Sequence, residues 1–500
     1  LPRKDAFCFA GAWYERFTER SRDLRGLLAA LAARKPVVIY DRNHGRDDPL
    51  YRFPDDLRPL VVGHLPYGEI DRAYKGYRYA ITMNTVKHSP SMCARRVFEL
   101  LASNTLTLGN FSHAVRTLFG DLVIGSDDAG EVVRRLDAVE RDETTSRAFR
   151  LAGLRKVMER HTYEDRLAEV VSKVRGAPRP DLLPPVAVVA RAVDPDEARA
   201  LRAAFERQRY ARKRLLLVVA DGVEEGAGGD AAVRVLRERD AEETACPGCF
   251  EPGELVAGIV AADHHGPNYL LDLALATRYA RARAVGKACR FRRFDDGAVR
   301  LVDGAARYVP VERLAARRAL VQAEAIPSGS LAAWARGLPD TSIDGVGLVA
   351  VDEFGYCEEG APAARDGSLA AVDGLLPGVD EGIDPAALVA HAERIAGEPL
   401  PAADRPGITG ADLAGLFPPR RGRRLVAEVV GQAWRIDSTF AAGETRWWQA
   451  ASDVAPARLG FDERARCCLE AEGDLAPGLV VTFLDDARQP LGRAAGDAGH

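Results

Sequence analysis

Arg96 and Glu99 are the two residues of this 500-residue chain whose types and spacing most directly suggest chemistry. They stand in the stretch Arg-Val-Phe-Glu-Leu-Leu-Ala over residues 96–102, whose apolar residues recur at helical spacing. Residues three apart lie on one face of a helix, so the guanidinium and the carboxylate are neighbours. An arginine can clamp a phosphate, and a carboxylate can accept hydrogen bonds from sugar hydroxyls. The pair therefore suits a ligand that carries both a phosphate and sugar hydroxyls.

The residues around this pair predict a loop, a helix over about 91–103 and a buried strand over 105–108. A helix N-terminus carries unpaired N–H groups and partial positive charge, so it favours a phosphate. Ser91, at the start of the predicted helix, is therefore a candidate binding residue. An ordinary amphipathic helix with a surface Arg–Glu pair is the alternative.

Short apolar runs alternate with helical patterns through residues 1–175. This alternation predicts βαβ units and a parallel sheet covered on both faces, with ligands at the carboxyl ends of the strands. Gly11 and Asn84 follow predicted strands and Arg16 stands near the first one, so all three are candidate binding residues. The predicted strands are 7–10, 36–40, 80–84, 105–108 and 122–124, and the predicted helices are 21–33, 66–76, 91–103 and 130–139, with a helical tail over 144–174.

The stretch at 96–102 resembles the signature Arg-x-Phe-Glu-x-Leu-Ala of spore-maturation-like (group 1) glycosyltransferases of the two-domain GT-B type. Segments 9–14, 39–43 and 65–70 resemble the same family in the same order. The resemblance implies a Rossmann-like domain over residues 1–175 that binds a nucleotide-diphosphate sugar. In that reading Arg96 stabilises the leaving diphosphate and Glu99 holds the ribose or the sugar.

The resemblance also leaves two gaps. Ser91 stands where related retaining transferases carry a second glutamate. Only the donor-binding half of the two-domain fold is recognisable, so the acceptor half would be a missing N-terminal segment or a separate chain.

A Pro-rich linker over 176–185 predicts a domain boundary. After it, residues 186–362 resemble the single-domain GT-A type (family 2-like) glycosyltransferases. A strand over 186–190, a helix over 194–208 and a strand over 214–220 resemble the first βαβ unit of that family. Asp221 matches the family's nucleotide-gripping aspartate.

Residues 261–270 resemble the segment in which GT-A enzymes hold Mg or Mn. A hard divalent cation takes oxygen ligands and neutralises a leaving diphosphate. Asp263 alone remains of the family's aspartate run, so it is the metal candidate. The resemblance further implies Lys287 as a phosphate contact, and Asp344 is a candidate catalytic base. A degenerate copy that only binds or scaffolds is the alternative.

The C-terminal part changes character. Residues 363–420 predict an irregular or helical connector. Residues 421–500 predict a small β-sandwich of short strands, expected at 425–430, 445–450, 465–470 and 479–483. Trp434, Trp447 and Trp448 either stack on sugar rings or lie in the core of that sandwich.

Bulk composition excludes some classes of function. The formal net charge of −4 gives no reason to expect nucleic acid as a partner, and no apolar run approaches the ~18 residues of a membrane span. Eight scattered cysteines are typical of reduced thiols in the cytoplasm. Cys246 and Cys249 have the spacing of half a zinc site or a redox pair, but no completing ligands are evident, so free thiols are expected.

The sequence thus predicts a glycosyltransferase that moves a sugar from a nucleotide-diphosphate donor to a glycan, protein or small-molecule acceptor. The alternative is a non-catalytic nucleotide-sugar or carbohydrate-binding scaffold derived from transferase domains.

Overall fold

A computed structural model describes residues 2–223, 231–361 and 369–390, together with the backbone of five strands between 420 and 496. Residues 1–387 form one unit and residues 388–500 form a second. The linker expected at 176–185 therefore lies inside the first unit. Among the described helices, none is long and apolar enough to cross a membrane.

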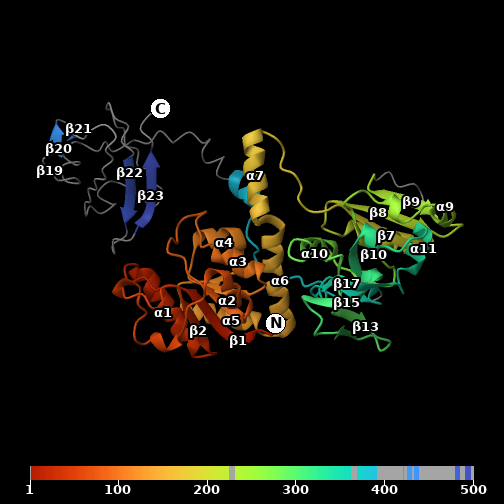
Figure 1. The fold of residues 1–500 in the computed structure, drawn as a ribbon, viewed down its shortest axis with the longest axis horizontal. Coiled ribbons are helices and arrows are strands. Elements are labelled where there is room, and N and C mark those ends of the chain that lie inside the picture. The colour runs from red at the N-terminus through yellow and green to blue at the C-terminus, as the bar shows by residue number, and fades with distance from the viewer. Residues whose placement is uncertain are drawn as a thin grey trace. The chain divides into compact units, whose positions relative to one another are not determined.

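The first sheet has six strands, in the order β3-β2-β1-β4-β5-β6 (Figure 1). Every pairing in it is parallel, with Phe7 opposite Val37 and Cys8 opposite Ala80. The carboxyl ends of these strands therefore meet at one edge of the sheet, where loops can converge on a ligand. The strands are β1 (Lys4–Gly11), β2 (Val37–Asp41), β3 (Val61–Gly63), β4 (Tyr77–Thr82), β5 (Leu106–Gly109) and β6 (Ile124–Gly125).

Helices cover both faces of this sheet because side chains alternate along its central strand. Phe7 and Phe9 pack in one apolar cluster with α1 and α5, and Cys8 and Ala10 pack in another with α2 and α3. The helices of this part are α1 (Thr18–Ala32), α2 (Asp71–Lys75), α3 (Arg96–Ala102), α4 (His113–Phe119), α5 (Ala129–Val139), α6 (Glu143–Arg160) and α7 (Tyr163–Arg175).

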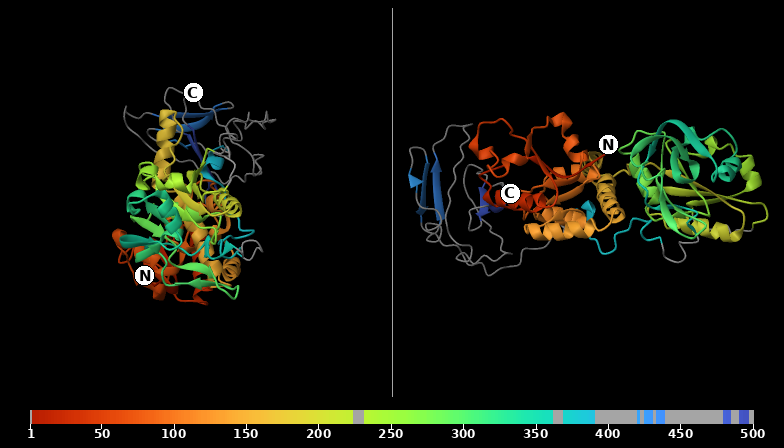
Figure 2. Two further views of the ribbon diagram at one scale, coloured as in Figure 1. Left: turned by 90° about the vertical axis from the view of Figure 1, so that its right-hand side faces the viewer. Right: turned by 90° about the horizontal axis from the view of Figure 1, so that it is seen from below.

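A second, mixed sheet of eight strands has the order β15-β17-β12-β16-β10-β7-β8-β9, and Figure 2 gives two further views of it. Val188 on β7 packs with α8 and α10, and its neighbour Val189 packs with α9 and α11 on the other face. The strands are β7 (Val186–Ala192), β8 (Lys213–Val219), β9 (Val233–Arg237), β10 (Leu255–Ile259), β12 (Ala284–Gly286), β15 (Val309–Ala315), β16 (Ala319–Gln322) and β17 (Ser342–Ala350). The helices are α8 (Pro195–Glu206), α9 (Glu238–Glu242), α10 (Tyr269–Ala276) and α11 (Leu331–Gly337).

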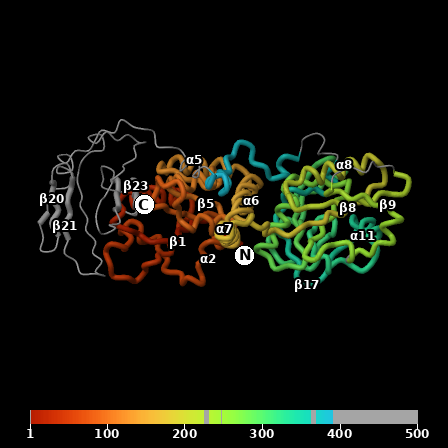
Figure 3. Tube along the Cα trace, turned by 90° about the horizontal axis from the view of Figure 1, so that it is seen from above, coloured from red at the N-terminus to blue at the C-terminus, as the bar shows by residue number. Residues whose placement is uncertain are grey.

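Buried ion pairs join the helices of the first part to residues 186–361. Helix α6 contacts both α3 and α10, and the trace can be followed in Figure 3. Arg155 on α6 binds Asp272 on α10 through both carboxylate oxygens, at 2.8 and 3.0 Å. Arg278 donates to Asp165 on α7 at 2.9 Å. Breaking such a buried pair costs about 3–5 kcal/mol, so these contacts hold the two sheets within one unit.

Three smaller sheets complete the described structure. The first has the order β11-β18-β13-β14, and the strands of the second unit form a three-stranded and a two-stranded sheet. Two predicted strands, 425–430 and 479–483, are present in the second unit, whereas those at 445–450 and 465–470 lie outside the described residues. The strands are β11 (His264–His265), β13 (Arg290–Arg293), β14 (Val299–Val302), β18 (Tyr356–Glu358), β19 (Arg420–Arg421), β20 (Leu425–Val430), β21 (Ala433–Ser438), β22 (Leu479–Leu484) and β23 (Pro490–Gly496).

The predicted α/β architecture of the N-terminal part is confirmed by the six-stranded parallel sheet. Three predicted boundaries were wrong. The strand expected at 122–124 begins at Ile124, and the helical tail expected at 144–174 is divided into α6 and α7. The helix expected from residue 91 begins at Arg96. Its preceding turn is held by the side chain of Asn84, which accepts from the Ala94 N–H at 2.8 Å. Because the first five predicted helical residues are irregular, Ser91 does not lie at a helix N-terminus.

Candidate functional site

A pocket of about 350 Å³ opens at the carboxyl edge of the first sheet. It brings together three of the predicted site residues, Gly11, Arg96 and Glu99. The other residues that line it are Ala12, Tyr14, Arg20, Arg42, Tyr74, Met83, Thr85, Ala94 and Arg95. The loops after β1, β2 and β4 and the first turn of α3 therefore converge on one space.

Arg20 is the most unusual side chain of this pocket. It lies in the first turn of α1, is only 5% exposed, and forms no ion pair with a carboxylate of the described residues. Its guanidinium donates to the Ala12 carbonyl at 3.2 Å and lies 4.9 Å from the ring centroid of Tyr14. Burial lowers the pKa of Arg20 to about 10; Tyr14 opposes this shift, and the nearby Arg96 and Arg42 add to it. A buried cation with these neighbours favours an anion beside it.

Two further arginines in the pocket form no ion pair with a carboxylate of the described chain. Arg96 lies 5.9 Å from the ring centroid of Phe9, and its Nε is buried without a hydrogen-bond partner. Arg42 is exposed directly after β2. Together with Arg20 they place three guanidinium groups around one cavity, an arrangement suited to an anion with several oxygen atoms.

Glu99 supplies the negative side of the pocket. Its Oε1 lies 2.8 Å from Nε of Arg95, and its Oε2 accepts from the Tyr74 hydroxyl at 3.0 Å. Burial raises the pKa of Tyr74, Arg96 opposes this rise, and Glu99 adds to it. The carboxylate is thus fixed in place and remains partly exposed, so it can accept further hydrogen bonds from hydroxyl groups.

Gly11 contributes to the pocket through its backbone, and Asn84 contributes through a side-chain contact with the backbone of Ala94. A Cβ added at Gly11 would lie 2.5 Å from Cζ of Phe9, so a side chain there would push into the ring beneath the pocket. Asn84 is buried, and its side chain holds the Ala94 N–H, so it positions the loop that leads into α3.

Arg16 and Ser91 are not brought to this pocket. Arg16 is exposed, with its guanidinium 4.7 Å from the ring centroid of Phe17, and it does not line the cavity. Ser91 is exposed in the irregular segment before α3. Neither residue contacts the three guanidinium groups described above.

Asp263, the metal candidate, lies in a different environment from the one expected. It is 5% exposed and binds Arg317 through both oxygens, with Nε 2.8 Å from Oδ2. Its oxygens also accept from the Tyr356 hydroxyl at 2.7 Å and from the Glu359 N–H at 2.9 Å. A guanidinium already neutralises this carboxylate, so the residues present do not fit a divalent cation.

Lys287 and Asp221 do not line the pocket that contains Arg20, Arg96 and Glu99. Lys287 is fully buried, and its Nζ lies 2.6 Å from Oδ1 of Asp352. Contact with a phosphate would require that buried ion pair to open. Asp221 is exposed directly after β8.

Asp344 is not placed beside Asp263. It lies on β17, six residues before the carboxyl end of that strand at Ala350, and pairs on the surface with Arg313 at 2.6 Å. At about 3.3 Å per residue, it stands about 20 Å from the carboxyl edge of the sheet. Asp263 follows the carboxyl end of β10, so the two carboxylates do not share a site.

The Cys-Pro-Gly-Cys segment forms a turn between α9 and β10. Both cysteines are free thiols, and Sγ of Cys249 lies 2.8 Å from the carbonyl oxygen of Cys246. Among the described residues, neither thiol belongs to a group of three or more acidic, histidine or cysteine side chains that could hold a metal ion.

Three residues of the pocket were missed by the sequence analysis: Arg20, Arg42 and Tyr74. Arg42 lies two residues after the predicted strand 36–40, so the rule that ligands bind at carboxyl ends of strands could have found it. Arg20 lies ten residues after the predicted strand 7–10, in the first turn of α1, where that rule gives no signal. Tyr74 carries no such signal, because its approach to Glu99 depends on the packing of α2 against α3.

Residues 20–172 match a protein-family model described as "Glycosyl transferase-like". That range contains most of the pocket, including Arg20, Arg42, Arg96 and Glu99. Residues 20–172, less than a third of the chain, are therefore similar to glycosyltransferases. No curated protein matches the chain.

Solved structures of low similarity include residues 1–349 of TarS from S. aureus, determined with and without UDP-GlcNAc. The structure with UDP-GlcNAc is 8% identical, with a TM-score of 0.25 over 35% of this chain and 58% of that one. The structure without it is 9% identical, with a TM-score of 0.24 over 35% and 60%. The glycosyltransferase SnogD from Streptomyces nogalater is 14% identical, with a TM-score of 0.11 over 55% and 80%. The chain thus spans less than two thirds of the TarS structures.

Proposed function

We propose that the pocket at the carboxyl edge of the first sheet binds the diphosphate of a nucleotide sugar, and that the protein transfers the sugar to an acceptor. The observation that carries this proposal is Arg20, a buried guanidinium without a carboxylate partner in the described chain, beside Arg42 and Arg96. A diphosphate supplies the negative charge that these three groups lack. The glycosyltransferase-like family match over the same residues supports the choice of reaction.

The chemistry follows from where charge develops. In glycosyl transfer the bond between the anomeric carbon and the diphosphate oxygen breaks, and the electron pair stays on the diphosphate. Fixed cations beside that oxygen stabilise the developing charge, which is the largest single contribution to rate in many enzymes. Arg20 and Arg96 are held by the fold before the ligand binds, so little reorganisation is needed.

Glu99 is proposed to accept hydrogen bonds from hydroxyls of the ribose or of the sugar. Its contacts with Tyr74 and Arg95 orient one carboxylate oxygen each. We also propose that this domain is of the GT-B type.

Residues 186–361 are proposed to act as a non-catalytic scaffold in the GT-A-like class. The observation that favours this role is the Asp263–Arg317 ion pair, which takes the place expected for a metal. A buried pair of this kind fixes β10 against the turn before β16, and it provides no ligand for Mg²⁺ or Mn²⁺.

Thermal unfolding against a panel of nucleoside diphosphates and their sugars tests the proposal, with EDTA in one arm and Mn²⁺ in the other. A ligand at a hundred times its dissociation constant stabilises the domain that binds it by about 2.7 kcal/mol. We expect one base to shift the transition equally in both arms. If no ligand of the panel shifts the transition, the proposed donor site is refuted. A shift seen only with Mn²⁺ would refute the proposal that the arginines bind the diphosphate without a metal.

A further inference from the structure

Lys87 lies at the centre of a group of three carboxylates, Glu19, Asp23 and Asp127, called the carboxylate cluster below. Its Nζ is 2.7 Å from Oε1 of Glu19, 2.5 Å from Oδ2 of Asp23 and 2.9 Å from Oδ2 of Asp127. The ligand oxygens of the cluster lie within 4.8 Å of one another. An ammonium group therefore already occupies the position that a cation would take.

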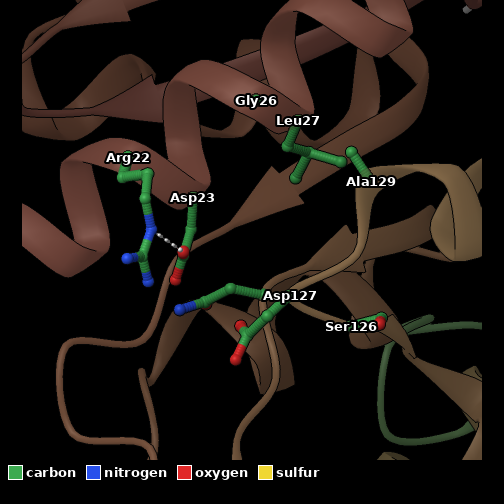
Figure 4. Close-up of a pocket in the computed structure, with 8 residues that line it drawn as sticks. Arg22, Asp23, Gly26, Leu27, Ser126, Asp127 and Ala129 are labelled. Carbon is green, nitrogen blue, oxygen red and sulfur yellow. Dashed lines mark ion pairs between the residues drawn. The ribbon is translucent and has the colours of Figure 1, made fainter.

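Two members of the cluster, Asp23 and Asp127, line a second cavity of about 190 Å³ beside α1. Figure 4 shows Asp23, on α1, and Asp127, from the loop before α5, on the same side of this cavity. Arg22 also approaches Asp23, with Nε 3.6 Å from Oδ1. Lys87 and Asp23 are both buried, so the ion pair between them is shielded from water.

Lys87 connects two elements that supply the anion pocket. Glu19 and Asp23 are four apart and so lie on one face of α1, the helix that carries Arg20. Lys87 itself lies in the loop between β4 and α3, which carries Thr85, Ala94 and Arg95 to the pocket.

The same loop is pinned at two further points. The backbone of Asn84 exchanges hydrogen bonds with the side chain of Asn110, at 2.8 and 2.9 Å. The carbonyl of Lys87 accepts from the His113 N–H at 2.6 Å. Met83 of this loop also packs in one apolar cluster with Leu24 of α1. Among the hydrogen bonds and ion pairs of the described residues, those of the Lys87 ammonium are the ones that tie this loop to side chains of α1.

We propose that Lys87 is a positioning residue: by bridging α1 to the β4–α3 loop through the carboxylate cluster, it sets the spacing between Arg20 and Arg96, the arginine of α3. This inference rests on the proposed function of the anion pocket. The expected consequence is that loss of the ammonium lets the three anions repel one another and moves Arg20 relative to Arg96.

Burial by itself would lower the pKa of Lys87, but its hydrogen bonds with Asp23, Glu19 and Asp127 outweigh burial and raise that pKa. The ammonium therefore stays charged across the neutral range, and the bridge does not switch with pH under ordinary conditions.

Titration calorimetry of the full chain with inorganic pyrophosphate tests the inference, because this probe carries the part common to all nucleotide-diphosphate sugars. We expect Lys87→Ala to bind pyrophosphate about tenfold more weakly, equivalent to ~1.4 kcal/mol. Lys75→Ala is the matched control: Lys75 makes an exposed pair with Asp71 on α2, and its removal should leave the affinity unchanged.

Chemical rescue separates positioning from a general loss of packing. Ethylammonium replaces the end of the missing side chain, so it should restore pyrophosphate affinity to Lys87→Ala, whereas tetramethylammonium at equal ionic strength should not. Should Lys87→Ala fail to fold, Asp127→Asn provides the second test: Asp127 is 43% exposed at its side chain, and its substitution should weaken binding by a smaller factor.

The outcomes are distinct. Wild-type protein that does not bind pyrophosphate would refute the proposed function itself. Wild-type binding with equal affinity in Lys87→Ala would overturn the inference alone, as would weak binding that ethylammonium does not restore. Where only Asp127→Asn can be studied, affinity equal to that of wild type would overturn it.

Discussion

Nε of Arg317 lies 2.8 Å from Oδ2 of Asp263, and the two buried side chains form a bidentate ion pair at the carboxyl end of β10. Residues 261–270 resemble a metal-binding segment, but the oxygens of Asp263 are occupied by this ion pair. Its carboxylate accepts four hydrogen bonds, from Arg317 (two), Tyr356 and Glu359.

Asp263→Asn should destabilise the first unit strongly. Removing one partner of a buried pair costs about 3–5 kcal/mol, and Arg317 would keep only the half-exposed carboxylate of Glu359, at 3.0 Å. Chemical denaturation of the full chain measures this change. The double variant Asp263→Asn, Arg317→Gln should lose less than the sum of the two single variants, because the partners are coupled.

Asp344→Asn is the matched control, since Asp344 pairs with Arg313 on the surface, where exposed ion pairs contribute about 0–1 kcal/mol. A loss of transferase activity in this control with unchanged stability would restore Asp344 as a catalytic base. Comparable stability of Asp263→Asn and wild type would contradict the buried-pair account.

Glu99→Gln should separate recognition of hydroxyls from recognition of phosphate. The Glu99 carboxylate is negatively charged and does not attract the diphosphate. Its replacement by an amide should therefore leave the affinity for pyrophosphate equal or raise it. Affinity for the preferred nucleoside diphosphate should fall about tenfold, as expected when a charged hydrogen bond worth ~1.5 kcal/mol or more is lost.

Calorimetry with both ligands makes this comparison. Glu69→Gln, in an exposed pair with Arg72, is the matched control and should change neither affinity. Equal losses for pyrophosphate and the nucleotide would show that Glu99 acts only by holding the fold of the pocket.

His161 should make the first unit sensitive to acid. It is buried against Phe98 and Phe119, and burial lowers its pKa to about 4, with Arg166 and Lys156 adding to the shift. The unfolded chain takes up a proton near pH 6.5, whereas the folded state resists it down to about pH 4.

Stability is therefore fully present above pH 6.5 and falls as the pH drops from there to about 4, by up to ~1.4 kcal/mol per pH unit for this one group. His161→Gln should flatten that part of the stability profile, measured by denaturant unfolding at a series of pH values. His64→Gln, at an exposed position, should leave the slope unchanged. An unaltered slope in His161→Gln would assign the acid sensitivity elsewhere.

Local patterns predicted the first sheet well because its strands are short apolar runs between amphipathic helices. The Phe7–Ala10 strand and the helix around Leu24 follow from periodicity alone. The start of α3 could not be predicted, because the side chain of Asn84 and the Lys87 bridge determine where the preceding loop ends. The contact of Lys87 with Asp23 joins residues far apart in the sequence.

The candidate site was predicted in part for the same reason. Arg96 and Glu99 belong to one local motif, so the sequence brings them together. Arg20 and Tyr74 reach the pocket from other helices, and the partner of Asp263 is 54 residues away in the chain. A resemblance to a metal-binding segment does not reveal that Asp263 forms a buried ion pair with Arg317.

Arg20→Met, compared with wild type by calorimetry in the presence of EDTA, tests the central claim most directly. Methionine retains a long apolar stem and removes the buried charge, so the fold should persist. The account predicts that wild type binds pyrophosphate and one nucleoside diphosphate without metal. It predicts at least tenfold weaker binding of both to Arg20→Met (about 1.4 kcal/mol or more), and unchanged binding to the exposed control Arg16→Met. Equal affinities of Arg20→Met and wild type would contradict it.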